Sequence, residues 1–313
     1  IGDNGLRRVA RFCGLPAAHR RPAISGPGET GGYPRTMAEK SEFYEIDTGI
    51  AEVLHEPDGS MVLLVNGVPS SHIVPGDPER LDFEYMRWMA DFIDDAYSAG
   101  PKEKARLTHL GGAACTMPRY FAHAWKGSRN TVVEIDSELA VLARELFDVP
   151  RAPAVKIRVG DAREETDGFK PATRDVIIRD VFTSATTPRN LTTVEFYGAA
   201  RASLSERGVY LANCGSHADL KEAKDELAGM VEVWPHVAAI ADPPMLKGRR
   251  YGNIVLIGAN LPIEATPELT RNLLMGAVPA QFKDDAWARS LAAQGAARHD
   301  PEQLDPETED PGV

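Results

Sequence analysis

The sequence has few cysteines and no long hydrophobic run. Its three cysteines, Cys13, Cys115 and Cys214, lie far apart and show no C-x-x-C spacing, so they imply neither a structural metal site nor a disulfide framework. Sparse, unpaired cysteines are typical of a reducing compartment, and we expect a cytoplasmic protein. No apolar run approaches the roughly 20 residues that span a bilayer, and no apolar core of a secretory signal follows the N-terminal arginines, so we expect no membrane partner.

The chain also has fewer basic than acidic residues. Lys and Arg number 35 against 46 Asp and Glu, which gives a net charge of −11 and a pI near 5.3. Nucleic-acid binding needs clustered basic residues that neutralise phosphates, so we expect no nucleic-acid partner. Hydrophobic residues make up 43% of the 313 residues, which is enough for one large α/β domain and a smaller unit beside it.

The chain divides by pattern into four parts. Residues 1–38 mix arginines with Gly and Pro without a period, which predicts a disordered leader before the pattern that begins after Met37. Residues 39–80 alternate in period two around turns at 57–59 and 66–67, which predicts a small antiparallel β unit. Residues 81–262 form the main domain, and 263–313 are expected to be a helical extension, over 267–293, and then a disordered acidic tail from His299.

Strands alternate with helices in the main domain. Apolar runs at 106–111, 131–135, 155–159, 175–179 and 208–213 are separated by amphipathic segments, which predicts a doubly wound, mostly parallel α/β sheet. Two last strands, expected at 231–241 and 251–258, have no helix between them by pattern and predict an antiparallel hairpin at one edge. The helix expected at 81–97 carries Asp94 and Asp95 on a face that we expect to be solvated, and Ser137 is the expected N-cap of the helix at 137–147.

Small residues and acids follow successive strands of this sheet. Gly111 and Gly112 open a turn that lets the backbone approach a ligand, and Glu134 ends the second strand, where an acid can accept both hydroxyls of a ribose. Asp161 and Asp180 end the third and fourth strands. The carboxyl ends of parallel strands share one edge, so these residues predict a nucleotide site there, with helix capping as the alternative explanation for the two aspartates.

Other candidate residues have simpler structural explanations. His109 lies inside a strand and is expected to be packed, and Cys115 is expected to be a small filler because no base stands beside it in the sequence. The basic loop at 247–250 is expected to be solvated. We find no convincing cluster of metal ligands.

The order of these motifs resembles the aminopropyltransferases, the spermidine synthase family. The resemblance covers roughly residues 43–259 and rests on the G-G turn at 111–112, V-E-I-D at 133–136, G-D-A at 160–162 and I-I-R-D at 177–180. It implies a methyltransferase-like Rossmann domain and decarboxylated S-adenosylmethionine as a co-substrate, without a prosthetic group. It also implies a small-molecule amine as the second substrate and, because the family commonly forms dimers, a homodimer.

The resemblance assigns roles to particular residues. Glu134 would hold the ribose hydroxyls, and Asp161 with Ala162 would face the adenine. Asp180 would be the acid that helps to deprotonate the attacking amine, and Tyr85 falls where the family has a tyrosine near the polyamine. An alkyl amine has a pKa of about 10.4, so it must lose a proton before it can attack, and a carboxylate near its channel can accept that proton.

Two departures from the family keep three functions open. Ala113 stands where the family's G-G-G-D-G-G turn has an aspartate, which helps to hold the cationic end of the donor, and Thr183 replaces the second acid of D-x-x-D-P. The first function is aminopropyl transfer to a polyamine with Asp180 as the base. The second is methylation by S-adenosylmethionine, since loss of the acid at Ala113 makes room for a donor carboxylate. The third is a non-catalytic, nucleoside-binding protein of the same fold.

Overall fold

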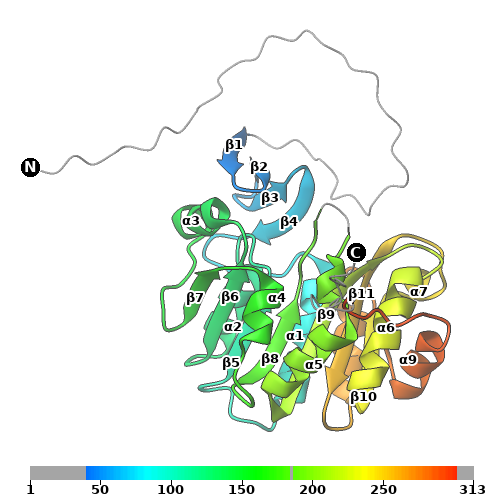
Figure 1. Ribbon diagram of the computed structural model, residues 1–313. Helices are drawn as coiled ribbons and strands as arrows, with labels where there is room; N and C mark the ends of the chain where they lie inside the picture. The colour runs from blue at the N-terminus through cyan, green and yellow to red at the C-terminus, as the bar shows by residue number, and fades with distance from the viewer. Residues whose placement is uncertain (1–39, 184–185, 302–313) are drawn as a thin grey trace, which may run out of the picture.

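A computed structural model describes residues 40–183 and 186–301. The predicted leader at 1–38 and the tail beyond 301 lie outside these residues. The described chain contains a small four-stranded sheet and a large eight-stranded sheet, and Figure 1 shows the small sheet standing beside α3 at one end of the large one. No helix within the described residues is long and apolar enough to cross a membrane.

The small sheet confirms the predicted antiparallel β unit. Its strands pair in chain order and are β1 (Lys40–Ile46), β2 (Gly49–His55), β3 (Met61–Val65) and β4 (Val68–Ile73). Asn66 and Gly67 form the tight turn between β3 and β4 with φ angles of 52° and 80°, as a two-residue hairpin turn requires. The Asn66 side chain also accepts a hydrogen bond from the Ile50 amide, which fastens this turn to the β1–β2 hairpin.

The large sheet is α/β and mostly parallel, as predicted. Its order is β12-β10-β11-β9-β8-β5-β6-β7, and the five strands from β9 to β7 in this order run parallel. The strands are β5 (Arg106–Leu110), β6 (Arg129–Glu134), β7 (Val155–Val159), β8 (Arg174–Arg179), β9 (Leu204–Ser216), β10 (His236–Ala241), β11 (Gly252–Ala259) and β12 (Gln281–Lys283). The pair β10–β11 is antiparallel, as predicted, but three details differ from the expectation. A short helix, α7 (Pro243–Leu246), lies between the two strands, and residues 231–233 end α6, so that β10 begins only at 236. The pair also does not form the edge of the sheet, because β12 pairs outside β10.

Helices cover both faces of this sheet. Alternate residues of β8 divide the core: Val176 and Ile178 pack with α1 (Glu84–Ala96), α2 (Thr116–Ala124) and α8 (Pro267–Met275), whereas Ile177 packs on the opposite side. That opposite layer contains α4 (Ala162–Asp167), α5 (Val194–Ser203), α6 (Lys221–Val233) and α9 (Asp285–Ala292), and α4, α5 and α6 lie in front of the strands in Figure 1. The helix α3 (Ser137–Leu146) packs between the large sheet and the small one.

The expectation of a solvated face for Asp94 and Asp95 is wrong. Asp94 is half-buried and accepts hydrogen bonds from Lys102 Nζ (2.6 Å), the Tyr120 hydroxyl (2.7 Å) and Trp125 Nε1 (2.7 Å), which tie α1 to α2. Asp95 accepts a hydrogen bond from the Thr266 hydroxyl, which caps α8. Both acids therefore join α1 to its neighbours, and spacing alone could not reveal partners that lie so far along the chain.

Two expectations about helix ends are also corrected. Asp136, rather than Ser137, is the N-cap of α3, since its carboxylate accepts from the Leu139 amide at 2.7 Å. The segment at 267–293 is not helical throughout, because β12 lies between α8 and α9. The chain from His299 was expected to be a disordered tail, but His299 and Asp300 make specific contacts with α4 and α5.

Candidate active site

The ends of β5 and β8 meet where the sheet reverses its winding. The chain continues from β5 toward β6 on one side and from β8 toward β9 on the other, so this is the topological switch point of the parallel strands. The Asp180 amide donates to the Leu110 carbonyl at 2.9 Å, which holds the two strand ends together. Gly111 has φ of 88°, and a Cβ there would lie 2.2 Å from the Asp180 carbonyl oxygen, so only glycine fits this contact.

Glu134 organises the turn that follows β5. Its Oε2 accepts from the amides of Gly112 (2.9 Å) and Ala113 (3.1 Å), while Oε1 accepts from the Asp136 amide (3.1 Å). A Cβ on Gly112 would lie 2.6 Å from Val132 Cγ1, so the turn can pack on β6 only with glycine there. Burial raises the pKa of Glu134, and the three backbone hydrogen bonds oppose that rise. A carboxylate has further acceptor positions, so Glu134 can still receive hydroxyl donors from a ligand.

Ile135 is a candidate binding residue that sequence reasoning missed. It was expected to be part of a strand, yet 58% of it is exposed at the end of β6, between Glu134 and Asp136. An exposed aliphatic side chain between two acids offers an apolar surface to a flat ligand group. The signal in the sequence was the V-E-I-D motif itself, in which an apolar residue follows the acid that ends the strand.

Asp161 and Ala162 lie at the start of α4, next to the end of β7. One oxygen of Asp161 accepts from the amides of Arg163 (2.7 Å) and Glu164 (3.1 Å), so the residue is the N-cap of this helix, and Ala162 is buried beneath it. The capping alternative is therefore correct for Asp161. Its role toward adenine stays a prediction, because the cap uses only one of the two carboxylate oxygens.

Asp180, Tyr85 and Asn213 form a hydrogen-bonded cluster at the switch point. The Tyr85 hydroxyl donates to Asp180 Oδ2 at 2.9 Å, and Asn213 Nδ2 donates to Oδ1 at 3.0 Å. Tyr85 comes from α1 and Asn213 from β9, and both are buried, while part of Asp180 remains exposed. Burial of the carboxylate raises the pKa of Asp180, an effect that the two hydrogen bonds oppose. The structure thus brings together the two residues predicted for catalysis.

A buried ion pair lies directly behind this cluster. Arg179 is fully buried, and its guanidinium lies 2.9 Å from a carboxylate oxygen of Glu226, which also accepts from the Tyr197 hydroxyl at 2.9 Å. Arg179 also donates to the carbonyls of Leu191 (3.0 Å) and Asn213 (3.1 Å). Arg179, which precedes Asp180 in the chain, therefore holds the backbone of Asn213, and Asn213 in turn binds Asp180. Sequence reasoning used only the aspartate of I-I-R-D and missed Arg179, whose charge suggested no burial.

No family model matches the chain. A crystal structure of a probable spermidine synthase from Corynebacterium glutamicum ATCC 13032 is 53% identical and has a TM-score of 0.80, over 85% of this chain and 99% of that one. The chain belongs to the spermidine synthase family.

One further relative and one further solved structure are similar to the chain. A polyamine aminopropyltransferase from Vibrio vulnificus (strain CMCP6) is 30% identical over 149 residues, which are 46% of this chain and only 48% of that protein. A spermidine synthase solved in complex with the transition-state analogue AdoDATO has a TM-score of 0.53 at 16% identity, over 79% of this chain and 82% of that one, which shows a shared fold. The family resemblance drawn from the sequence is therefore confirmed.

The remaining candidate residues are structural or lie apart from the cluster. His109 is packed, as expected: it contacts Asn130 Oδ1 at 3.0 Å, and burial lowers its pKa to about 4. Burial raises the pKa of Cys115 to about 12, so this buried thiol is no nucleophile. The loop at 247–250 is not merely solvated, because Arg250 pairs with the buried Asp242 at 2.6 Å. Within the described residues, no group of three or more His, Cys, Asp or Glu could hold a metal.

Proposed function

We propose that this protein transfers an aminopropyl group from decarboxylated S-adenosylmethionine to a polyamine, with Asp180 as the general base. The observation that carries the proposal is the cluster of Tyr85, Asp180 and Asn213 at the switch point of the sheet. A partly exposed carboxylate with a raised pKa is suited to attract an ammonium group and then accept its proton. Membership of the spermidine synthase family supports this reaction.

The reaction forms one bond and breaks one. The amine nitrogen attacks the methylene carbon of the aminopropyl group, the carbon–sulfur bond breaks, and the sulfonium leaves as a neutral thioether. The proton lost by the amine passes to Asp180. Tyr85 and Asn213 orient the carboxylate through its two oxygens, so that its accepting lone pairs are held in a fixed direction.

The donor would lie along the turn after β5. Glu134 would accept the ribose hydroxyls, Ile135 would pack against the adenine ring, and the start of α4 at Asp161 would face the edge of that ring. The related fold that contains AdoDATO supports a donor of the S-adenosylmethionine type. Gly111 and Gly112 would let this donor approach the backbone closely.

A second candidate function is methyl transfer from S-adenosylmethionine, and Ala113 is the observation that favours it. Ala113 stands in the turn beside Glu134, where the family has an acid that would repel a donor carboxylate. Calorimetric titration with S-adenosylmethionine, its decarboxylated form and methylthioadenosine discriminates between the two functions. Preference for the carboxylated donor would exclude aminopropyl transfer, and failure to bind any of the three would leave a non-catalytic protein of this fold.

Turnover itself is tested by following methylthioadenosine release with putrescine or a longer polyamine as the acceptor. Asp180→Asn is expected to reduce kcat by at least about 100-fold while nucleoside binding is retained, since general bases contribute about 10²–10⁴-fold. Ala113→Asp is the companion variant. It is expected to favour the decarboxylated donor, and unchanged donor preference would remove position 113 from donor selection.

The proposal also covers the oligomeric state of the protein and its cellular compartment. We propose a homodimer in the cytoplasm, on the basis of the family resemblance and of the sparse cysteines. Light scattering coupled to gel filtration measures the mass in solution, for which a monomer of 34.0 kDa is the reference. Cell fractionation with an antibody against the chain tests the compartment.

A further inference from the structure

We propose that residues 296–300, here called the C-terminal strap, position the donor side of the active site through the ion pair of Arg163 with Asp300. This inference rests on the proposed nucleoside site at α4. The three helices that the strap contacts, α4, α5 and α6, follow β7, β8 and β9, so their first turns lie at the carboxyl edge of the parallel strands. The strap therefore runs along the edge where ligands of such sheets bind.

The strap begins on α6. The Ala296 amide donates to Asp225 Oδ1 at 3.1 Å, and the Arg298 guanidinium donates to Asp225 Oδ2 at 3.2 Å. Arg298 also donates to the Thr192 hydroxyl at 3.1 Å, and its carbonyl accepts from the Val194 amide at 2.8 Å. Backbone and side chains together thus join the N-terminal half of α6 to the start of α5.

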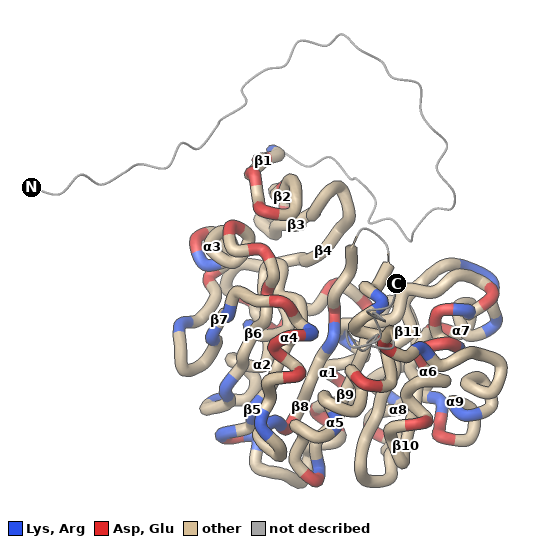
Figure 2. Tube along the Cα trace, in the orientation of Figure 1, with Lys and Arg blue, Asp and Glu red and all other residues tan. Residues whose placement is uncertain are grey.

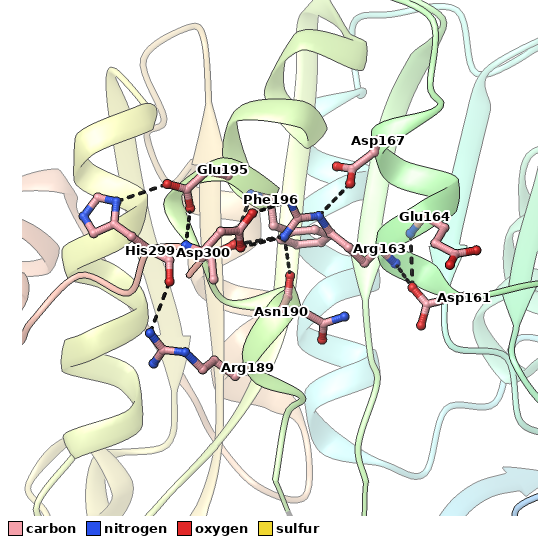
Figure 3. Close-up of polar contacts among 11 residues, drawn as sticks. Asp161, Arg163, Glu164, Asp167, Arg189, Asn190, Glu195, Phe196, His299 and Asp300 are labelled. Atoms are coloured by element: carbon pink, nitrogen blue, oxygen red, sulfur yellow. Dashed lines mark hydrogen bonds and ion pairs between the residues drawn. The ribbon is translucent and has the colours of Figure 1, made fainter. Parts of the chain in front are cut away.

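The strap continues over α5 toward α4, as Figure 3 shows. Glu195 in the first turn of α5 accepts from the Asp300 amide at 2.9 Å, and its other oxygen contacts His299 Nδ1 at 3.2 Å. The His299 carbonyl accepts from Arg189 at 3.1 Å. Glu195 therefore fixes the strap so that the Asp300 side chain faces α4.

Arg163 receives the end of the strap. Its guanidinium forms a bidentate pair with Asp300, with N–O distances of 2.8 Å and 2.5 Å, and it also donates to Asp167 (2.8 Å) and the Asn190 carbonyl (3.2 Å). The pairing with Arg163 lowers the pKa of Asp300, so this carboxylate is charged at neutral pH. The three acidic residues of α4 all follow Arg163 in the sequence, and the helix shows as a largely acidic segment in Figure 2.

The same residue connects the strap to the proposed nucleoside site. The Arg163 amide donates to the carboxylate of Asp161, while the Arg163 guanidinium binds the carboxylate of Asp300. A single residue therefore links Asp161 to Asp300. Asn190, which Arg163 also contacts, lies in the segment that follows Asp180. Loss of the strap contact is expected to free the first turn of α4, which has only six residues and little stability of its own. Arg163 and Asp300 are thus positioning residues for the donor.

The test compares two carboxylates that bind the same guanidinium. Asp300→Asn breaks the strap contact, whereas Asp167→Asn removes the pair within α4 and is the matched control. We expect Asp300→Asn to raise the KM of the donor and the Kd of methylthioadenosine about fivefold, with kcat at saturating donor unchanged, as for mutations along a coupling network. Asp167→Asn should stay within about twofold of wild type, and Asp300→Glu should restore much of the affinity.

Equal donor affinity in Asp300→Asn and wild type would overturn the proposal, as would an equal loss in Asp167→Asn. Both ion pairs are partly exposed, and the protein is expected to remain folded in each variant, which thermal melting checks. If the wild type binds no nucleoside, the proposed function fails, and the strap is then tested by amide exchange. Faster exchange over 162–167 in Asp300→Asn than in Asp167→Asn supports positioning of α4, and equal exchange overturns it.

Discussion

Asp180 is a carboxylate whose two hydrogen-bond partners come from different elements. Tyr85 reaches it from α1 and Asn213 from β9, and these contacts restrain its geometry without neutralising it. Neither partner is a cation, so burial dominates and raises the pKa of Asp180 from its ordinary value of 3.8. A carboxylate that holds its proton more tightly than a surface acid suits the general-base role proposed for Asp180 in a reaction near neutral pH.

The raised pKa of Asp180 has a consequence for stability. The folded state binds this proton more tightly than the unfolded state, so the stability that the protonated form provides is lost as pH rises through the raised pKa. Asp180→Asn has no ionised form and is expected to melt at a higher temperature than wild type at pH 7. The difference should vanish below about pH 4, where the unfolded carboxyl is also protonated. Calorimetric scans at both pH values test this, and a variant that melts lower than wild type at pH 7 contradicts it.

The buried pair of Arg179 and Glu226 leads to a second prediction at the residue scale. Glu226→Gln leaves the fully buried Arg179 without its counter-charge and should destabilise the protein by about 3–5 kcal/mol. Glu232→Gln, on the same helix but with a side chain 47% exposed, is the control and should change stability by less than about 0.5 kcal/mol. Denaturant unfolding measures both. Similar losses of unfolding free energy in the two variants would show that the buried ion pair contributes no more to stability than an exposed charge.

At the scale of elements, long periodic segments were predictable and short ones were not. The strand at 155–159 was predicted with its observed bounds, because apolar and basic residues alternate along it. The helix predicted at 193–204 extends one residue beyond each end of α5, because its buried residues recur with helical spacing. β12 has only three residues, too few for a period, and so was missed. At the candidate site, the acids at strand ends could be recognised from the sequence. The role of Arg179 could not, because it arises from contacts between elements that no local pattern records.

Gly111 gives a prediction about how two elements meet. Gly111→Ala would place a methyl group 2.2 Å from the Asp180 carbonyl oxygen and should push the ends of β5 and β8 apart, with loss of activity and of more than about 2 kcal/mol of stability. Gly127→Ala is a close control, since Gly127 has φ of 89° but nothing nearer than 3.9 Å to an added Cβ. In this control the alanine adds only the backbone strain of a left-handed φ angle, about 1–2 kcal/mol. Equal losses in stability and activity would mean that strain alone, and not the contact with Asp180, requires glycine.

At the scale of the whole molecule, one turn couples the two sheets. Asp47 and Thr48 connect β1 to β2, and both contact the start of α3. The amide and hydroxyl of Thr48 each donate to Asp136 at 2.7 Å, while the other oxygen of Asp136 caps α3. Asp47 accepts from the amide of Ser137 at 2.7 Å. Asp136, which follows Ile135 at the candidate site, thus also holds the small sheet in place. The candidate site and the small sheet therefore depend on the same carboxylate.

Thr48→Val tests this coupling. The change removes one donor to Asp136, which is buried to 1% exposure, and should cost about 1–3 kcal/mol because a buried carboxylate loses one of its hydrogen-bond donors. Thr270→Val, whose exposed hydroxyl donates only within α8, is the control and should be nearly neutral. Hydrogen exchange provides the spatial readout: amides of β1–β4 should exchange faster in Thr48→Val than in the control, and donor affinity should fall with them. Faster exchange confined to β1–β4, with donor affinity unchanged, would show that the small sheet is fastened by this turn but that the site does not depend on it.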